Sequence, residues 1–242
     1  MMYSFQNKVR YSEVNKELRL NIPSIVNYMQ DCSFFQSESL GVGVDFLNEI
    51  HRAWVLNSWQ IDILRDIPVC QDIKIGTWAY DAKGVYGYRN FVIRTMEDKP
   101  LVNANSLWVL LNTETGRPEK VTERDVKAYG QEERIDMEYL DRKIKTEGEG
   151  EMREKIPVRR YHIDTNGHVN NRWYVQFAME YISEEEKING HKINRIRVEY
   201  KKSAKYGDVI VPVVYSGKTD ITVSMNDEAG QPYAKVQLIA GQ

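Results

Sequence analysis

The sequence lacks most features of secreted, membrane-spanning or nucleic-acid-binding proteins. Its 242 residues include only two cysteines, Cys32 and Cys70, whose spacing fits neither a disulfide framework nor a zinc site. It has no run of about 18 apolar residues and no apolar leader at its start, so neither a membrane span nor a signal peptide is expected. The formal net charge of −2 lacks the basic excess of a nucleic-acid-binding surface. We therefore expect a cytoplasmic protein without a metal site or a nucleic-acid partner.

The chain is long enough for two domains, and an internal repeat indicates that it has them. Sliding the sequence so that Val9 falls on Val158 also places Asn21 on Asn170 without a gap. Strand-like segments with two-residue alternation then follow in the same order in both copies. They are WVLNSWQIDI with NRIRVEY, QDIKIGTW with GDVIVPVVY, and NANSLWVLL with YAKVQLI. Chance agreement does not preserve the order of elements in this way.

Both copies have the pattern of a strand, a long helix and several antiparallel strands. We place the N-terminal domain at residues 1–125 and the C-terminal domain at residues 155–242. A linker at residues 126–154 joins them and is rich in charge but poor in large apolar residues. The central helices are expected over residues 22–35 and 170–184.

The second of these helices is predicted to be a core helix. NNRWYVQFAMEYI carries Trp173, Tyr174 and Phe177 on one side but Val175 and Met179 on the other, and a helix that is apolar nearly all round is buried. With the strands available, only a curved antiparallel sheet wrapped around the helix achieves this. The sequence therefore predicts an α+β chain with a double hotdog fold, made of two tandem hotdog repeats. An unrelated α+β fold is the alternative.

A dense group of short polar residues precedes this helix: Asp164, Asn166, His168, Asn170 and Asn171. A turn requires residues such as Asn, Asp and Gly, and a helix start requires one cap, but neither requires a histidine between asparagines. The first copy has Asn15, Glu17 and Arg19 at the matching places. Because only one copy carries the polar group, we interpret it as catalytic.

This group resembles the active-site segment of the acyl-acyl carrier protein (acyl-ACP) thioesterases, in which an Asp-x-Asn-x-His-Val-Asn-Asn run precedes the helix of the second hotdog. The resemblance covers almost the whole chain through RAWVLNSWQIDI, QDIKIGTW, SLWVLLNTETGRPEKV and RVEYKKSAKYGD. It implies a bacterial-type thiolester hydrolase that releases free fatty acid from fatty acyl-ACP, in fatty acid biosynthesis, without a cofactor. It also places the acyl-chain pocket in the first half, where four tryptophans either line a channel or form sheet core: Trp54, Trp59, Trp78 and Trp108.

Hydrolysis of a thioester needs a water activated beside the carbonyl and hydrogen-bond donors where the oxyanion forms. Histidine exchanges protons near neutral pH, so His168 is a candidate base, while Asp164 either orients that imidazole or polarises the water itself. The Asn166 amide can hold the water or the thioester oxygen. Asn170 or Asn171 caps the helix, whose N–H groups and positive dipole end would then face the oxyanion.

The strand that closes the site departs from the family pattern. Plant members carry a Glu-Cys pair after "YRR", whereas this chain has YKKSAKYGD, with Ser203 and Ala204 at those positions. A cysteine nucleophile and a carboxylate base are therefore missing there, and attack by water is predicted. Ser203 either holds a water or is an ordinary turn serine. Cys32 and Cys70 are expected to be inert core residues.

The expected partner is acyl carrier protein with its acyl-phosphopantetheine arm. Carrier proteins are acidic, so their docking surface should be basic. From Lys192 to Lys205 the chain holds six cations against one acid, Glu199. We predict docking by five of these cations and a neighbouring arginine: Arg172, Arg195, Arg197, Lys201, Lys202 and Lys205. An ordinary solvated strand face is the alternative, and the protein is expected to be a monomer or a homodimer.

Other interpretations stay open at this point. The nearest is an acyl-CoA thioesterase of the hotdog superfamily. A dehydratase of hydroxyacyl carriers is less favoured, because it would use a His and a carboxylate from opposite subunits rather than an Asn-rich turn. The missing Glu-Cys pair also fits a non-catalytic protein that binds or senses acyl thioesters.

Overall fold

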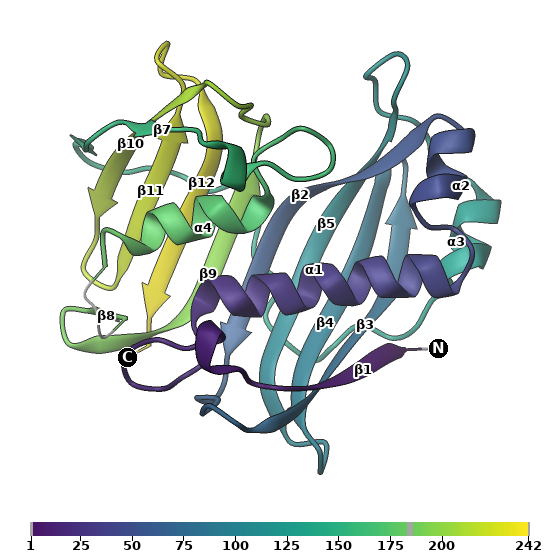
Figure 1. The fold of residues 1–242 in the computed structure, drawn as a ribbon, viewed down its shortest axis with the longest axis horizontal. Helices are drawn as coiled ribbons and strands as arrows, with labels where there is room; N and C mark the ends of the chain where they lie inside the picture. Colours follow the sequence, from purple (N-terminus) through teal and green to yellow (C-terminus); the bar gives the residue numbers. More distant parts are fainter. Residues whose placement is uncertain (1, 183–185, 242) are drawn as a thin grey trace. The chain divides into compact units, whose positions relative to one another are not determined.

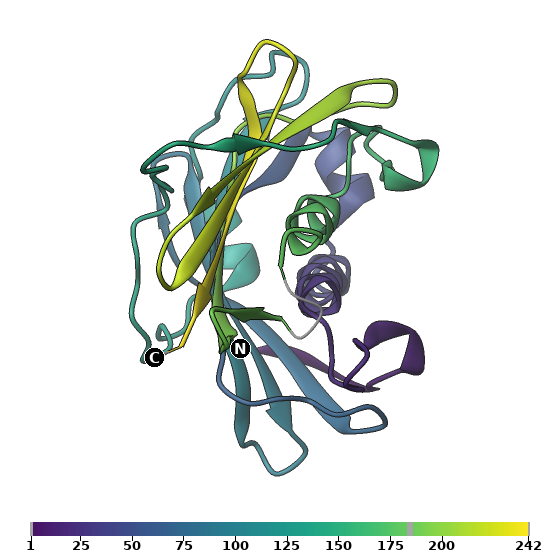
Figure 2. The ribbon, with the colours of Figure 1, turned by 90° about the vertical axis from the view of Figure 1, so that its left-hand side faces the viewer.

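The computed structural model describes residues 2–182 and 186–241. The chain divides into two compact units, residues 1–140 and 141–242. In each unit a helix lies along the concave face of an antiparallel sheet (Figures 1 and 2). None of the helices in the described ranges has the length and apolar character needed to cross a bilayer.

The sheet of the N-terminal unit has the order β1-β3-β4-β5-β2, and each neighbouring pair is antiparallel. Its strands are β1 (Tyr3–Lys8), β2 (Arg52–Ile63), β3 (Asp72–Lys83), β4 (Tyr86–Thr95) and β5 (Pro100–Asn112). Its helices are η1 (Tyr11–Glu13, a 3-10 helix), α1 (Ile22–Ser39), α2 (Val44–Glu49) and α3 (Glu123–Tyr129).

The sheet of the C-terminal unit has the order β9-β12-β11-β10-β6, with β7 paired to the start of β10 and β8 in a hairpin with β9. Its strands are β6 (Glu151–Met152), β7 (Ile156–Pro157), β8 (Lys187–Ile188), β9 (His191–Tyr200), β10 (Val209–Ser216), β11 (Asp220–Asn226) and β12 (Pro232–Ala240). Its helices are η2 (Arg160–His162, a 3-10 helix) and α4 (Asn171–Met179).

The two units share one topology. In chain order and in sheet order, β2, β3, β4 and β5 correspond to β9, β10, β11 and β12. β1 lies beside β3 just as β6 and β7 lie beside β10. The strand segments paired in the sequence are therefore equivalent strands in the structure. Both units have a central helix packed on a curved antiparallel sheet, which confirms the predicted double hotdog fold.

Polar contacts near the two ends of α1 explain where the helix begins and how far it extends. Asn21 caps its start by accepting the N–H of Ser24, and Pro23 lies in the first turn, where no amide donor is needed. The helix continues past residue 35 because Gln36 is buried and its amide oxygen accepts a hydrogen bond from Arg89 of β4.

α4 is shorter than the helix expected from the sequence. It ends at Met179, and Tyr181 and Ile182 donate their N–H groups to carbonyls three residues earlier, which tightens the chain into a turn. Ile182 is the last residue described before a gap, and the predicted helix end at 183–184 lies outside the described residues. Of the apolar residues predicted to bury α4, Tyr174, Val175 and Phe177 are buried, whereas Trp173 and Met179 are half-buried.

The two cysteines have different surroundings. Cys32 is fully buried on α1, with Sγ 3.7 Å from the carbonyl oxygen of Ile75. Burial raises the pKa of its thiol to about 12, so Cys32 is an inert core residue. Cys70 is exposed in the turn before β3, with a φ of 66°. The prediction that Cys70 belongs to the core is therefore wrong.

The first part of the linker packs against the sheet of the N-terminal unit, on the face away from α1. The Trp78 indole donates to the carbonyl of Glu133 at 2.8 Å, and the Gln60 amide donates to the carbonyl of Glu138 at 2.7 Å. The charged side chains of this segment face solvent while its backbone supplies acceptors to the sheet. This part of the linker is therefore rich in exposed charged side chains, but its backbone is bonded to the sheet.

A tight turn precedes α1, and its shape depends on one side chain. Asn15 Oδ1 accepts the N–H groups of Glu17 and Arg19, each at 3.1 Å. The Asn15 N–H in turn donates to the carbonyl of Arg19 at 2.8 Å, and Leu18 has a φ of 57°. These bonds form an Asx turn that directs the chain into the helix.

We predict that Asn15→Ala lowers the free energy of unfolding by about 1–2 kcal/mol, because two N–H groups lose their acceptor. Glu17→Ala in the same turn is the control: its exposed carboxylate makes no hydrogen bond within the described residues, and we expect a change below about 0.5 kcal/mol. Urea unfolding of the three proteins measures both effects. Equal stability of the two variants would contradict the role of the Asn15 side chain.

Candidate active site

The polar group before α4 forms the same Asx turn as its counterpart before α1. Asp164 Oδ1 accepts the N–H of Asn166 at 2.8 Å and the N–H of His168 at 3.3 Å. The Asp164 N–H donates to the carbonyl of His168 at 2.8 Å. Gly167 has a φ of 76°, a conformation in which glycine avoids the steric cost of a side chain. The fold therefore requires this turn in both units, and Asp164 is its organiser.

Backbone bonds attach the turn to its surroundings on both sides. Val169 donates its N–H to the carbonyl of Ala204 in the loop after β9, at 2.9 Å. Asn170 donates its N–H to the carbonyl of His162 in η2, also at 2.9 Å. Asn170 Oδ1 accepts the N–H of Arg172 at 3.1 Å, so Asn170 is the helix cap. Asn171 is the first helical residue, so its N–H belongs to the set of amides that have no partner inside a helix.

The side chains on this turn differ in their accessibility. Asn166 is exposed, while Asp164 and His168 are half-buried. Within the described residues, neither the His168 imidazole nor the Asn166 amide makes a hydrogen bond. Asp164 bonds the backbone of His168 and not its ring. Of the two roles considered for Asp164, orientation of the imidazole has no hydrogen bond to support it in this structure.

Tyr174 makes a hydrogen bond through its hydroxyl group that the sequence analysis did not predict. It is 2% exposed, and its hydroxyl oxygen accepts the N–H of Ala204 at 3.0 Å. Burial raises the pKa of Tyr174 to about 12, which keeps the hydroxyl protonated. The first copy has Ile25 at the matching place, so a tyrosine in only one copy was the signal available. Because the Ala204 carbonyl accepts the N–H of Val169, Tyr174 holds the loop that supports the turn before α4.

The residues at the positions of the family's Glu-Cys pair have opposite environments. Ser203 is exposed and makes no hydrogen bond within the described part of the chain, whereas Ala204 is fully buried. Both backbone groups of Ala204 are bonded, to Tyr174 and to Val169. Ala204 therefore holds the turn in place through its backbone groups.

His162 is a second residue that the sequence analysis missed. It is 3% exposed, and its Nδ1 accepts the N–H of Arg159 at 3.0 Å, which puts the proton of the neutral ring on Nε2. The rings of Trp173 and Phe177 lie 4.7 Å and 5.0 Å from it. Burial lowers the pKa of His162, and the neighbouring Arg159 and Arg172 lower it further. His162 is therefore held neutral as a structural acceptor.

Several of the predicted docking cations are used inside the C-terminal unit. Arg197 donates to Gln237 and to the carbonyls of Asp141 and Lys143. Lys201 pairs with the buried Glu199, which also accepts the N–H of Ile144. The strand face that bears Arg197 and Glu199 is thus covered by the end of the linker rather than open to solvent.

The remaining cations of that set have other surroundings. Lys202 pairs with Asp227 and lies over the Tyr233 ring, while the Arg172 guanidinium lies 4.2 Å from the Trp173 ring centre. Arg195 is half-buried and is not free of partners. Lys205 is exposed, and its ammonium has no carboxylate partner among the described residues. The sequence predicted one basic surface, but in the structure several of its cations are bonded within the C-terminal unit, whereas Lys205 has no carboxylate partner among the described residues.

The tryptophans of the N-terminal unit fall on two faces of its sheet. Trp59 pairs in register with Ser106 and contacts Phe91, on the face toward α1. Trp54 and Trp108 flank Gly87 on the same face. The Trp78 ring is on the opposite face, against the linker. Trp54, Trp59 and Trp108 thus share the inner face, and Trp78 does not.

Sequence profiles of known protein families match most of the chain. Residues 1–129 match the sequence profile of the acyl-ACP thioesterase N-terminal domain, and residues 145–238 match that of the acyl-ACP thioesterase C-terminal domain. The chain belongs to the acyl-ACP thioesterase family. Within this family, curated relatives include the chloroplastic oleoyl-acyl carrier protein thioesterase of Coriandrum sativum, 25% identical over 84% of this chain and 59% of the relative. The chloroplastic oleoyl-acyl carrier protein thioesterase 1 of Arabidopsis thaliana is 24% identical over 87% of this chain and 62% of the relative.

The chain therefore spans roughly three fifths of the length of these two relatives, at 59% and 62%. Solved structures of family members cover it more fully. An acyl-ACP thioesterase from Bacteroides thetaiotaomicron has a TM-score of 0.90 at 20% identity, covering 99% of this chain and 98% of that one. The 12:0-ACP thioesterase from Umbellularia californica has a TM-score of 0.84 at 19% identity, covering 98% and 96%. At these identities the likeness shows the shared fold.

The lowered pKa of His162 predicts a pH dependence of stability. The unfolded chain binds the His162 proton near the ordinary pKa of about 6.5, while the folded chain binds it only at lower pH. Between these two values the unfolded state holds more protons, so stability falls as pH drops below about 6.5. His162→Gln retains an acceptor for the Arg159 N–H but does not titrate.

Unfolding free energies of the wild type and His162→Gln, measured from about pH 7.5 to pH 5, test this prediction. We expect the advantage of the wild type over the variant to shrink toward acid pH. A difference that stays constant across this range would show that His162 does not titrate differently in the folded and unfolded states.

Proposed function

We propose that this protein hydrolyses the thioester of fatty acyl-ACP and releases free fatty acid. The observation that carries the proposal is the contrast between the two Asx turns. Both have the same backbone, but only the turn in the C-terminal unit adds His168 and Asn166, side chains that the fold does not use. Membership in the acyl-ACP thioesterase family and the named hydrolases among its relatives support this activity.

The proposed mechanism is attack by water. His168 takes a proton from the water, whose oxygen attacks the carbonyl carbon and forms a tetrahedral oxyanion. The amide of Asn166 and the backbone N–H of Asn171, the first residue of α4, stabilise that oxyanion together with the positive end of the helix dipole. The C–S bond then breaks, and the leaving thiolate takes the proton from His168. Asp164 acts through its position, because its Oδ1 is already bonded to the turn.

We also propose that the N-terminal unit receives the acyl chain. Trp54, Trp59 and Trp108 share the inner face of its sheet, where the Trp54 ring packs closely against Gly87. Aromatic side chains of this size supply a large apolar surface for a hydrocarbon chain. Trp78 is left out of this proposal because its ring contacts the linker.

Basic residues near the turn, with Arg172 and Lys205 foremost, are proposed to dock the acidic carrier protein. A cytoplasmic location, a role in fatty acid biosynthesis and a monomeric or homodimeric state remain predictions from the sequence. The alternatives are an acyl-CoA thioesterase and a non-catalytic acyl-thioester binding protein. Incubation with acyl-ACP and acyl-CoA thioesters, with release of free thiol measured, separates the three. Thiol release from acyl-CoA alone, or from neither, would reject the proposed activity.

Substitutions in the turn test the assignment of roles. We expect His168→Ala and Asn166→Ala each to lower kcat by roughly 10²–10⁴, the usual loss for a general base or an oxyanion donor. Their unfolding free energies should change by less than about 0.5 kcal/mol. Ser203→Ala is the matched control on the neighbouring loop, and its kcat should change less than about threefold. Full activity of His168→Ala, or an acyl group trapped covalently on the enzyme, would contradict attack by water.

Asp164→Asn separates the structural role of Asp164 from any chemical one. Asn15 makes the same backbone bonds in the first turn, so asparagine at position 164 should preserve stability to within about 0.5 kcal/mol. Asp164→Ala should cost about 1–2 kcal/mol. If Asp164 only positions the turn, Asp164→Asn keeps most of kcat, while Asp164→Ala loses it. A kcat of Asp164→Asn as low as that of His168→Ala would instead make Asp164 the general base.

A further inference from the structure

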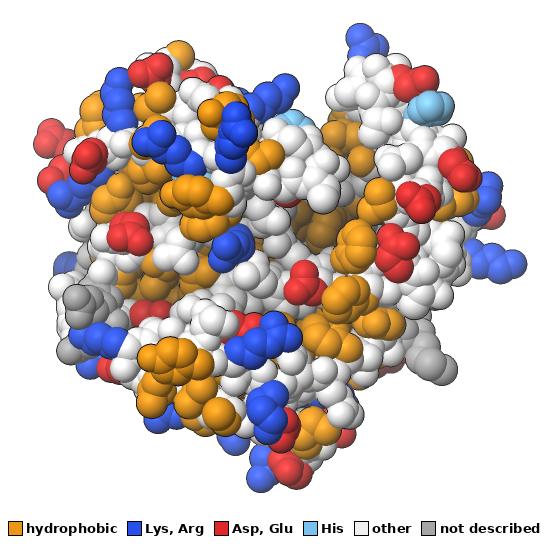
Figure 3. All heavy atoms as spheres, in the orientation of Figure 1, with side chains coloured by type: hydrophobic (Ala, Val, Ile, Leu, Met, Phe, Trp, Pro, Cys, Tyr) orange, Lys and Arg blue, Asp and Glu red, His pale blue; other side chains and the backbone are white. Residues whose placement is uncertain are grey.

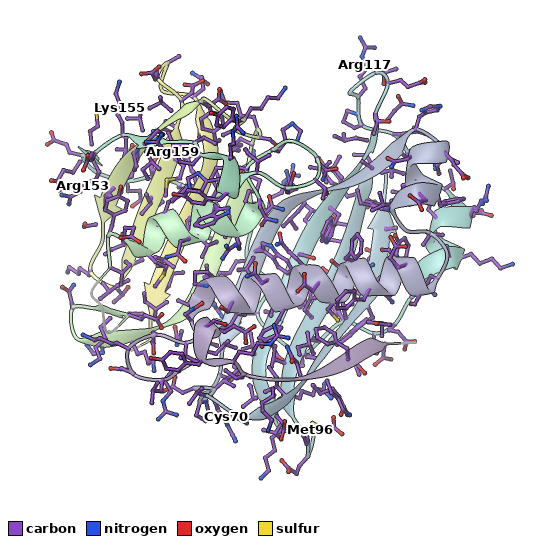
Figure 4. All side chains as sticks on the ribbon, in the orientation of Figure 1. Cys70, Met96, Arg117, Arg153, Lys155 and Arg159 are labelled. Carbon is purple, nitrogen blue, oxygen red and sulfur yellow. The ribbon has the colours of Figure 1, made fainter. Side chains whose placement is uncertain are left out.

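The exposed cations before α4 divide sharply into paired and unpaired ones. Arg153 pairs with Glu151 at 2.7 Å, and Lys155 pairs with Glu228 at 2.8 Å. Arg159, only four residues beyond Lys155, has no carboxylate partner among the described residues. Figure 4 labels all three cations on this stretch of the C-terminal unit.

Three more unpaired cations lie around Arg159, and two exposed tyrosines accompany them. Within the described residues, no carboxylate pairs with any of these cations. The group, here called the collar, consists of Arg159, Arg160, Arg172, Lys205, Tyr161 and Tyr206. In Figure 3, blue and orange side chains gather on this part of the C-terminal unit, over η2 and α4.

Ring contacts hold the collar together. The Arg160 guanidinium lies 5.5 Å from the Tyr206 ring centre, next to Lys205. The Tyr161 ring lies 5.5 Å from Trp173, whose other neighbour is Arg172 at 4.2 Å. Tyr161 and Tyr206 remain 69% and 59% exposed, so these rings are not needed to close the core. Stacking on a ring keeps a guanidinium extended and leaves its N–H groups open to a partner.

Two acids lie close to the collar: Asp208 accepts the backbone N–H of Lys205 at 2.9 Å, and Asp164 closes the adjoining turn. Around His162, by contrast, the local electrostatics are positive. The buried His162 is close to two arginines of the collar. Besides burial, Arg159 and Arg172 lower the pKa of His162, because positive neighbours disfavour its protonated form.

His162, which follows Tyr161 of the collar, is bonded to the residue after the candidate turn, because its carbonyl accepts the N–H of Asn170 at 2.9 Å. A partner held by the collar would therefore place its acyl arm beside His168.

We infer that the collar is the docking surface for the acidic face of the carrier protein. This inference rests on the proposed function and names the surface that serves it. Unpaired cations can form ion pairs with the carboxylates of a partner without first breaking an ion pair inside the protein. Lys201 and Lys202 would first have to leave Glu199 and Asp227, and Arg197 would have to leave the linker. The exposed tyrosines supply the amphipathic contact area typical of protein interfaces.

Two double variants with the same change in net charge test the inference. Arg159→Gln with Arg160→Gln removes two collar charges, and Arg153→Gln with Lys155→Gln removes two paired charges from the preceding segment. We expect the collar variant to raise KM for acyl-ACP about three- to tenfold, with kcat unchanged, and the control to change KM less than about twofold. KM for an acyl-pantetheine thioester, which lacks the carrier protein, should stay unchanged in both.

Salt and a turnover-free measurement complete the test. The KM of the wild type should rise with added salt, and more steeply than that of the collar variant. Titration of holo carrier protein onto each variant measures affinity for the carrier protein without hydrolysis. If the enzyme were inactive on every thioester, the proposed function would fail, but this binding measurement would still test the collar. Equal effects of the two double variants would overturn the inference. So would an equal rise of KM for acyl-CoA, since the collar would then bind a phosphate of the arm.

Discussion

The candidate site depends on two backbone hydrogen bonds that converge on one carboxylate oxygen of Asp164. They close the turn, and the turn then presents His168 and Asn166 beside the start of α4. Without them the segment would have to find other acceptors for two N–H groups at the mouth of a buried helix, where unpaired donors are costly. The candidate catalytic side chains are therefore placed by local hydrogen bonds to Asp164.

The repeat clarifies how such a site arises. An Asx turn precedes each central helix. Asn15 forms it in the N-terminal unit, and Asp164 forms it in the C-terminal unit. The chemistry enters through the two positions whose side chains the turn leaves unused. The same positions hold Glu17 and Arg19 in the first copy. One scaffold thus carries a structural turn in one unit and a candidate catalytic turn in the other.

The mechanism also explains how the chain manages without the Glu-Cys pair of the plant enzymes. Ala204 still holds the turn through its carbonyl, and its N–H is held by Tyr174. Those bonds involve only backbone groups at position 204, so holding the turn does not require a Glu or Cys side chain in this chain. The His168 imidazole, which makes no hydrogen bond within the described residues, is then the proposed proton acceptor.

The sequence by itself determined the repeat, the order of strands, the central helices and the polar turn, because apolar periodicity and short motifs are local properties. It also predicted that Asn170 or Asn171 caps the helix, and the structure shows that Asn170 is the cap. It could not show that Arg197 and Lys201 bind the linker and Glu199 while Arg159 and Arg160 have no acid partner, since pairing depends on residues distant in the chain. Nor could it reveal Tyr174 and His162 as supports of the turn. Their roles follow from burial and contact across the unit, which only tertiary structure decides, because the free energy of a polar group depends on what surrounds it.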